Sequence, residues 1–190
     1  ALFSRDERAM KKADAVEIKF GQAAKPGMGG HLPAEKVTPE IAKIRGIKPG
    51  EDFISPNRQL DVNSPEDLLK LVNWVKKVTG GKPVGVKFTA GHIEGDLKFV
   101  LAAEPDFITI DCRGGATGAA PSFIRDHICL PAIYAIRRAR IYLDSVKSPV
   151  TFCVTGGFRD SADIAKALAL GADAVALATT SLLAIGCQQY

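Results

Sequence analysis

From about residue 60 to the end of the chain, the hydrophobic positions change repeatedly between a helical spacing and a strand-like one. The first helix is the best marked. Ser64 suits the N-cap, Pro65 suits the first helical position, and Gly80–Gly81 suits the end. Its apolar residues fall on one helical face: Leu68, Leu71, Val72, Val75 and Val78. This pattern predicts a helix over residues 64–79 that packs one face against a core.

Helices and strands then alternate along the rest of the chain. Strands are predicted at residues 83–88, 107–111, 150–155 and 173–178. Helices are predicted near residues 96–103, at about 122–143, from a cap at Ser161 to Gly171, and from about Thr180. Upstream, a strand is predicted where Val16, Ile18 and Phe20 alternate with polar residues, and a short helix near Thr38. Residues 46–59 are rich in Pro, Gly and charge, which predicts a loop on the functional rim.

Repeated strand–loop–helix units give parallel strands with helical crossovers, in a doubly wound sheet or a (β/α)8 barrel. No G-x-G-x-x-G sequence opens the first turn, which counts against a dinucleotide-type sheet. A full barrel has about 250 residues. This chain has 190 residues and about five predicted strands. We therefore predict an α/β fold of the (β/α)8 TIM-barrel type, present as a partial barrel of about five strands in a single domain, residues 1–190.

Composition narrows the function classes. The chain is 46% hydrophobic and 24% charged, with a net charge of +4, and its basic residues are dispersed apart from a cluster at 137–140. Because aromatic residues do not interleave with basic ones, we expect no nucleic-acid partner. The four cysteines are widely spaced and close no metal site by themselves. We expect a reducing, cytoplasmic location, with membrane anchoring by a segment outside these residues left open.

The ends of the predicted strands carry the candidate chemistry, because barrel enzymes place their active sites there. Val84, Val86 and Phe88 share one strand face, so Lys87 should point into the barrel near its mouth. An anionic partner would satisfy a lysine at that position, and this reading is favoured over a side chain that extends to solvent. The loop after the next strand has residues that can form a nest of backbone donors: Gly114, Gly115, Thr117 and Gly118.

The loops after the last two predicted strands favour a phosphate site. Gly156 and Gly157 follow one strand, and Ala178 and Thr179 follow the next, each pair just before a helix. Barrels often bind phosphate with these two loops and a helix N-terminus. The pattern therefore predicts a phosphorylated ligand.

The loop after the first predicted strand, residues 21–33, adds Gln22, Lys25 and His31, and Arg45 lies on the short helix after it. A lysine and an arginine that converge on one pocket would suit a carboxylate. For His31, the sequence alone favours a hydrogen-bonded loop residue over a ligand-binding one.

Several segments, taken in order, resemble one family. They are F-G-Q-A-A-K-P-G-M-G-G-H-L-P at 20–33, I-S-P-N-R at 54–58, S-P-E-D-L at 64–68, V-K-F at 86–88, residues 117–121, T-G-G at 155–157 and A-L-G-A-D-A-V at 169–175. Together they resemble the FMN-binding domain of the glutamate synthase family, of the central or large-subunit-like type. The resemblance is to the C-terminal part of that barrel.

The resemblance implies an FMN-dependent oxidoreductase that reduces 2-iminoglutarate, formed from 2-oxoglutarate and ammonia, to L-glutamate. It assigns Lys25, His31 and Arg45 to the substrate. It assigns a larger set to the cofactor: Gln22, Lys87, Gly114, Gly115, Thr117, Gly118, Gly156, Gly157, Ala178 and Thr179. Cys187 matches the first of three cysteine ligands of an iron–sulfur cluster, which is expected in a full-length parent only. The resemblance implies that this cluster would receive electrons from a donor protein or an NADPH-linked subunit.

Two alternatives remain open from the sequence. One is a phosphate-binding barrel isomerase or lyase that uses Lys87, and the other is a non-catalytic glutamate-synthase-like module. The partner ligands of Cys187 do not occur in these 190 residues. We therefore expect the segment alone to assemble no cluster and to be inactive.

Overall fold

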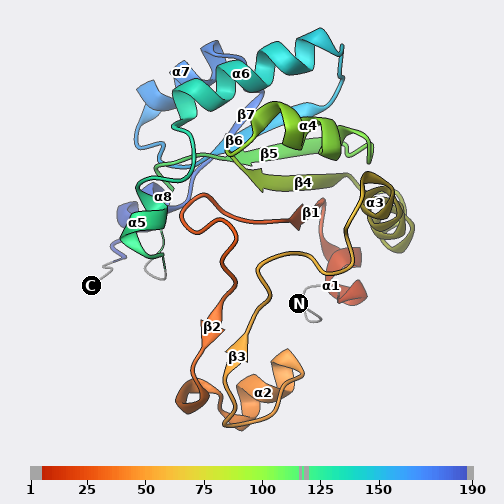
Figure 1. Cartoon of the computed structure of the whole chain (residues 1–190), viewed down its shortest axis with the longest axis vertical. Coiled ribbons are helices and arrows are strands. Elements are labelled where there is room, and N and C mark those ends of the chain that lie inside the picture. Colours follow the sequence, from red (N-terminus) through yellow and green to blue (C-terminus); the bar gives the residue numbers. More distant parts are fainter. Residues whose placement is uncertain (1–5, 116, 118–119, 188–190) are drawn as a thin grey trace.

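The computed structural model describes residues 6–115, 117 and 120–187. In this part of the chain, one sheet holds β1 (Val16–Lys19), β4 (Val84–Thr89), β5 (Phe107–Asp111), β6 (Thr151–Thr155) and β7 (Ala174–Ala176). The strands are parallel and lie in the order β1-β4-β5-β6-β7 (Figure 1). Each strand therefore adds beside the one before it, without the reversal of order that marks a doubly wound sheet. The fold is α/β, a partial barrel of the (β/α)8 type, as predicted.

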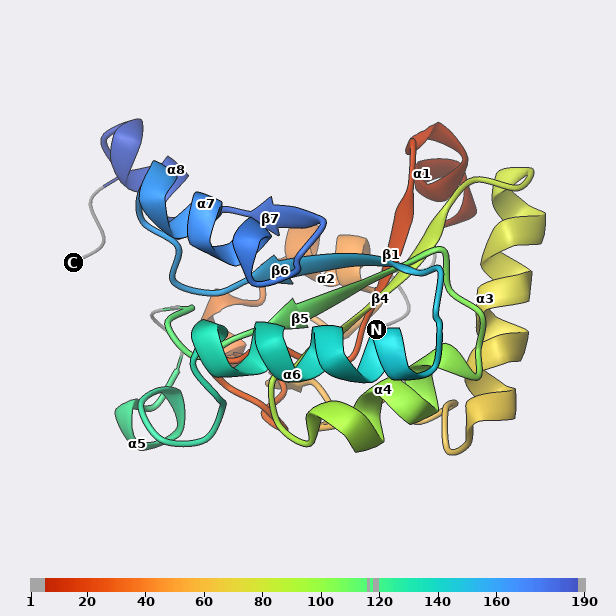
Figure 2. The same ribbon diagram turned by 90° about the horizontal axis from the view of Figure 1, so that it is seen from above.

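Helices on one side of this sheet make the crossovers. They are α3 (Pro65–Thr79), α4 (Ile93–Leu101), α6 (Ala132–Ser145) and α7 (Ser161–Ala169). Figure 2 shows α4 and α6 lying side by side along the sheet, which agrees with their mutual contacts. Val84, Val86 and Phe88 are buried in the same core cluster as Leu97 of α4 and Ile136 of α6. The opposite face of the strands, which carries Lys87, is left for the site.

Both ends of α3 are capped by the residues that the sequence predicts. The Ser64 hydroxyl accepts a hydrogen bond from the Asp67 N–H at 3.2 Å, and Gly80 ends the helix in a left-handed conformation with φ of 74°. Several other boundaries differ from prediction, and two of these differences have a local cause. The helix expected over 122–143 is divided into α5 (Ser122–Arg125) and α6, because Pro131 lies between them as the N-cap of α6. The cap of α7 is Asp160, whose carboxylate accepts from the Asp163 N–H, in place of Ser161.

Residues 31–54 form a separate projection, which we call the arm. It contains β2 (His31–Leu32), the 3-10 helix η2 (Ala34–Lys36), α2 (Pro39–Arg45) and β3 (Phe53–Ile54). In Figure 1 the arm extends away from the sheet and is joined to the rest of the molecule by two segments of the chain. β3 lies within residues 46–59, which were expected to form a loop. Its two residues form a strand because they pair antiparallel with β2. The arm's position decides where several predicted site residues lie.

Two short helices complete the described chain. The helix α1 (Glu7–Lys12) precedes β1, and α8 (Thr179–Ala184) follows β7. Among the described residues, no helix combines the length and apolar character needed to cross a membrane.

Candidate functional site

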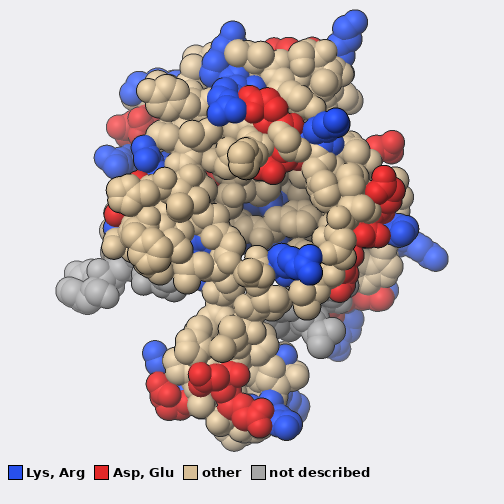
Figure 3. Space-filling model, in the orientation of Figure 1, with Lys and Arg blue, Asp and Glu red and all other residues tan. Residues whose placement is uncertain are grey.

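A cavity of about 560 Å³ lies at the carboxyl ends of the strands, and we call it the strand-end cavity. Thr89, Asp111, Thr155 and Ala176 are register partners across β4 to β7, so the strands end together at this rim. The last three of these residues line the cavity. Its volume falls within the range typical of cofactor sites, about 300–1,000 Å³. In the space-filling view, this side of the molecule is hollowed above the arm, with atoms of Lys or Arg at the floor and rim (Figure 3).

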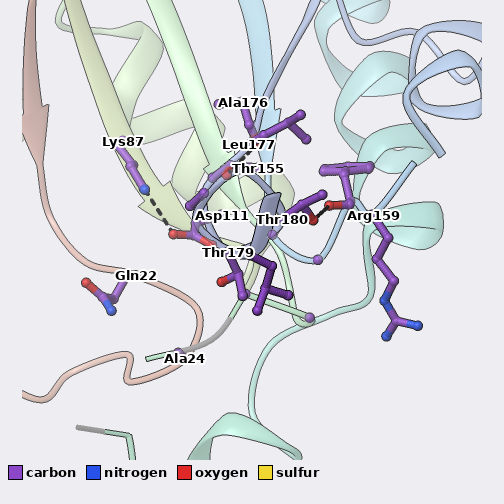
Figure 4. A pocket seen from close by; sticks show the side chains of 17 residues that line it. Gln22, Ala24, Lys87, Asp111, Thr155, Arg159, Ala176, Leu177, Thr179 and Thr180 are labelled. Carbon is purple, nitrogen blue, oxygen red and sulfur yellow. Dashed lines mark hydrogen bonds and ion pairs between the residues drawn. The ribbon is translucent and has the colours of Figure 1, made fainter. Parts of the chain in front are cut away.

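An ion pair occupies one wall of the strand-end cavity. Lys87 Nζ lies 3.0 Å from Asp111 Oδ2, and the two side chains are only 18% and 9% exposed. Figure 4 shows Lys87 reaching from β4 toward Asp111 at the end of β5. The anionic partner anticipated for an inward-facing lysine is therefore a carboxylate of the neighbouring strand. A buried pair of this kind is costly to break and holds both groups in place.

Two loops at the cavity meet backbone to backbone at glycines. Gly156, after β6, has φ of +111°, and a Cβ built on it would lie 2.2 Å from the carbonyl oxygen of Cys112. Gly157, with φ of +84°, would place a Cβ 2.7 Å from the Cα of Gly114 in the loop after β5. Real Cβ atoms do not come this close to backbone, and L side chains rarely adopt these angles. Glycine at these positions lets the two loops close one side of the cavity.

Hydrogen bonds from two threonines connect the segments after β6 and β7 that form another wall of the strand-end cavity. Thr155 Oγ1 donates to the carbonyl of Ala176 on β7 at 3.0 Å, and Thr180 Oγ1 donates to the carbonyl of Phe158 at 2.7 Å. Both bonds appear as dashed lines in Figure 4. Arg159 also lines the cavity and carries a second cation. The loops after β6 and β7 are thus joined, with a guanidinium beside them.

Most of the predicted cofactor residues lie together. Eight of them line the strand-end cavity: Gln22, Lys87, Gly114, Gly115, Gly156, Gly157, Ala178 and Thr179. Thr117 is not among the lining residues, and Gly118 lies outside the described residues. Thr180, which also lines the cavity, belongs to the 178–180 turn expected to hold the phosphate, whereas the sequence did not point to Asp111, Thr155 or Arg159 as site residues. Their position at the ends of the same strands was the signal that could have found them.

The three predicted substrate residues do not lie together. Lys25 lines a second cavity of about 430 Å³, which we call the edge cavity because it runs along β1. His31 lies on the arm, where its Nε2 is 2.9 Å from Asp52 Oδ2. This hydrogen bond lowers the pKa of the Asp52 carboxyl, and it is the hydrogen-bonded state that the sequence favoured for His31. Arg45 also lies on the arm, with its guanidinium carbon 6.0 Å from the ring centre of Phe53.

The described cysteines form no disulfide and no metal site. Cys112 and Cys129 are buried, and burial raises the pKa of both thiols. Cys187 is half-buried near the end of the described chain. Across residues 6–187, leaving out 116 and 118–119, no group of three His, Cys, Asp or Glu side chains could hold a metal ion. A cluster ligand role for Cys187 therefore stays a prediction about a longer protein.

Comparison with known proteins places the chain in a family. A family profile described as the conserved region in glutamate synthase matches residues 1–190. The chain belongs to the glutamate synthase family. It is 44% identical to an archaeal glutamate synthase (NADPH) of Methanocaldococcus jannaschii over 98% of this chain. It is 35% identical to a glutamate synthase large subunit-like protein of Rhizobium meliloti over 97% of this chain.

The chain spans less than half the length of these two glutamate synthase relatives. It covers 37% of the archaeal protein and 42% of the large subunit-like protein. Among solved structures, a mandelate oxidase variant with (S)-mandelic acid matches 93% of this chain and 44% of its own chain, with a TM-score of 0.51 and 18% identity. At that identity the likeness shows the fold alone. It agrees with a sheet that makes up part of a barrel.

Proposed function

We propose that this chain is part of the FMN-binding barrel of a glutamate synthase-type oxidoreductase, which reduces 2-iminoglutarate to L-glutamate. The observation that carries the proposal is the strand-end cavity. It gathers Lys87, Asp111 and the glycine loops at 114–115 and 156–157 in a chain of the glutamate synthase family. The relatives' names support the reaction class, since several are called glutamate synthase (NADPH).

The residues of the strand-end cavity fit FMN by the chemistry of their donors. The phosphate would lie against the loops after β6 and β7, where Gly157 and Thr179 present backbone at the cavity and Arg159 adds positive charge. The ring system would lie toward Lys87 and Gln22, on the opposite wall. Bound there, FMN in its reduced form would supply the hydride.

The chain's own groups would then bind, orient and exclude water. Lys87 puts its ammonium into the cavity wall, where positive charge can balance an anionic ring or substrate, and Asp111 fixes its direction at 3.0 Å. Gly114 and Gly156–Gly157 close one side by direct backbone contact, which leaves no space for water between the loops. Lys25, on the loop after β1, would bind a substrate carboxylate from the side of the edge cavity.

A pair of substitutions at Thr179 that differ only in charge tests the proposed cofactor site. In the full-length protein, Thr179→Glu would place a carboxylate at the loop proposed to bind phosphate, whereas Thr179→Gln adds the same bulk without charge. We expect protein incubated with FMN and passed through gel filtration to keep a flavin spectrum that dithionite bleaches. The Gln variant should retain flavin and the Glu variant should lose it. Equal retention by both variants, or no flavin in the unchanged protein, would contradict the proposal.

A further inference from the structure

The outward face of α6 carries large apolar side chains that no role assigned so far explains. Ile133, Tyr134 and Ile141 are 62%, 65% and 53% exposed. From Tyr134 to Asp144, exposed positions recur at spacings of three, four and three residues, which places them on one side of a helix. We call the four residues at these spacings the α6 seam: Tyr134, Arg137, Ile141 and Asp144. The buried residues of α6 lie on its other side, in the core.

Completion of the barrel would leave the α6 seam uncovered. Further strands of a (β/α)8 barrel would add beside β1 and β7, the two outer strands of the described sheet. In contrast, α6 joins β5 to β6 within the sheet, and α4 and α7 pack against it. In Figure 2, which is seen from above, no described element lies over α6. The exposed Leu182 and Leu183 of α8 differ, because they follow β7 at the open edge.

One cation of the basic cluster on α6 has no acidic partner within the described chain. Arg138 Nη2 lies 2.6 Å from Glu94 Oε2 of α4, and Arg140 Nη2 lies 2.7 Å from Asp144 Oδ1. Arg137 forms no ion pair among the described residues. The Asp144 side chain is 63% exposed, so its carboxylate can accept a second cation. The α6 seam therefore carries an open cation in its middle and an open acid at its C-terminal end.

We propose that the α6 seam binds a second copy of this protein, with the two α6 helices antiparallel about a twofold axis near Ala139. This arrangement sets Arg137 of each copy opposite Ile141 of the other, with its guanidinium within reach of the other copy's Asp144. The hydrocarbon stem of Arg137 would cover Ile141, and its charge would meet the acid.

The charges of the seam favour a second copy as the occupant. A twofold axis brings each cation to the opposite acid twice, so the seam is complementary to itself. Parallel helices in the same register would instead set like charges against each other. A stable interface takes about 800 Å² from each copy, more than one helix face offers, so α4 and α7 would supply its rim.

Charge reversal tests this inference. Sedimentation velocity of the full-length protein over a range of concentrations should show a dimer. Arg137→Asp makes both seam charges negative and Asp144→Arg makes both positive, so each variant alone should associate about 100-fold more weakly. An equimolar mixture of the two variants should associate again, because opposite charges then meet. Lys77→Asp, at an exposed position on α3, is the matched control and should associate like the unchanged protein.

Ile141→Ala removes apolar contact without changing charge. It should also weaken self-association, and it provides the test if a charge variant does not fold. A monomeric unchanged protein, a dimer that Arg137→Asp leaves intact, or a mixture that does not associate overturns the inference. If another segment of the full-length chain covers this face, Arg137→Asp will lower the urea midpoint and mixing will restore nothing, which also overturns it.

Discussion

Replacing Gly156 by alanine should disrupt the contact between the loops after β5 and β6. The added Cβ would lie 2.2 Å from the carbonyl oxygen and 2.8 Å from the nitrogen of Cys112, and the residue would keep φ of +111°. Forcing an L residue into positive φ costs about 1–2 kcal/mol. Overpacking against a backbone that cannot yield adds about 1–3 kcal/mol. We expect a loss of about 2–5 kcal/mol in the free energy of unfolding.

Two other glycines separate these contributions. Gly50→Ala has φ of +71° with nothing within 4 Å of the new Cβ, so it should cost only the backbone strain, about 1–2 kcal/mol. Gly85→Ala would place its Cβ 2.1 Å from the Phe107 ring without positive φ, so it should cost only the overpacking, about 1–3 kcal/mol.

Urea titration of the three full-length variants gives the comparison, and FMN affinity is measured in parallel. Gly156→Ala should be the most destabilised of the three and the weakest in binding FMN, because its loop borders the strand-end cavity. A cost for Gly156→Ala no larger than that for Gly50→Ala would refute the backbone contact as described.

Three further changes test other parts of the structure. Lys87→Met should cost about 3 kcal/mol in urea titration by leaving Asp111 buried without its partner, and adding Asp111→Leu should recover most of it; an equally unstable double variant would contradict this. Burial raises the pKa of Asp96, so its folded state favours the protonated acid, and its contribution to stability is lost as pH rises through the folded pKa. The difference in unfolding free energy between Asp96→Asn and the unchanged protein should therefore shift in favour of the variant as the pH is raised from about 3 to about 7. Urea titration at each pH measures this difference, and a difference that does not change with pH would count against the prediction. Ser64→Ala removes the cap of α3 and should cost about 1 kcal/mol by thermal or urea unfolding, whereas no change would mean that the cap is not formed.

Most of the barrel could be predicted because its signals are local. The strand at 107–111 has the predicted bounds, and α3 follows from its cap, its apolar face and its final glycines. Eight of the residues predicted to bind the cofactor line one cavity because the carboxyl ends of parallel strands meet at one rim, a prediction that needs only the strand assignments.

The remainder depends on contacts between distant segments. Two-residue strands such as β2 and β3 carry no periodicity, and they exist because His31 and Leu32 pair with residues more than twenty positions away. The arm that results keeps Arg45 apart from Lys25. The Lys87–Asp111 ion pair likewise joins neighbouring strands 24 positions apart in sequence. The break before α6 is different, since Pro131 was a local signal that the sequence reasoning passed over.

The most direct test of the central claim is anaerobic reoxidation of the flavin in the full-length protein. Protein that retains FMN would be reduced with dithionite, freed of excess reductant and mixed with 2-oxoglutarate and ammonium. A flavin site of the glutamate synthase type predicts return of the oxidised flavin spectrum together with an equimolar amount of L-glutamate. A flavin that stays reduced under these conditions, or is reoxidised without glutamate, would contradict the account.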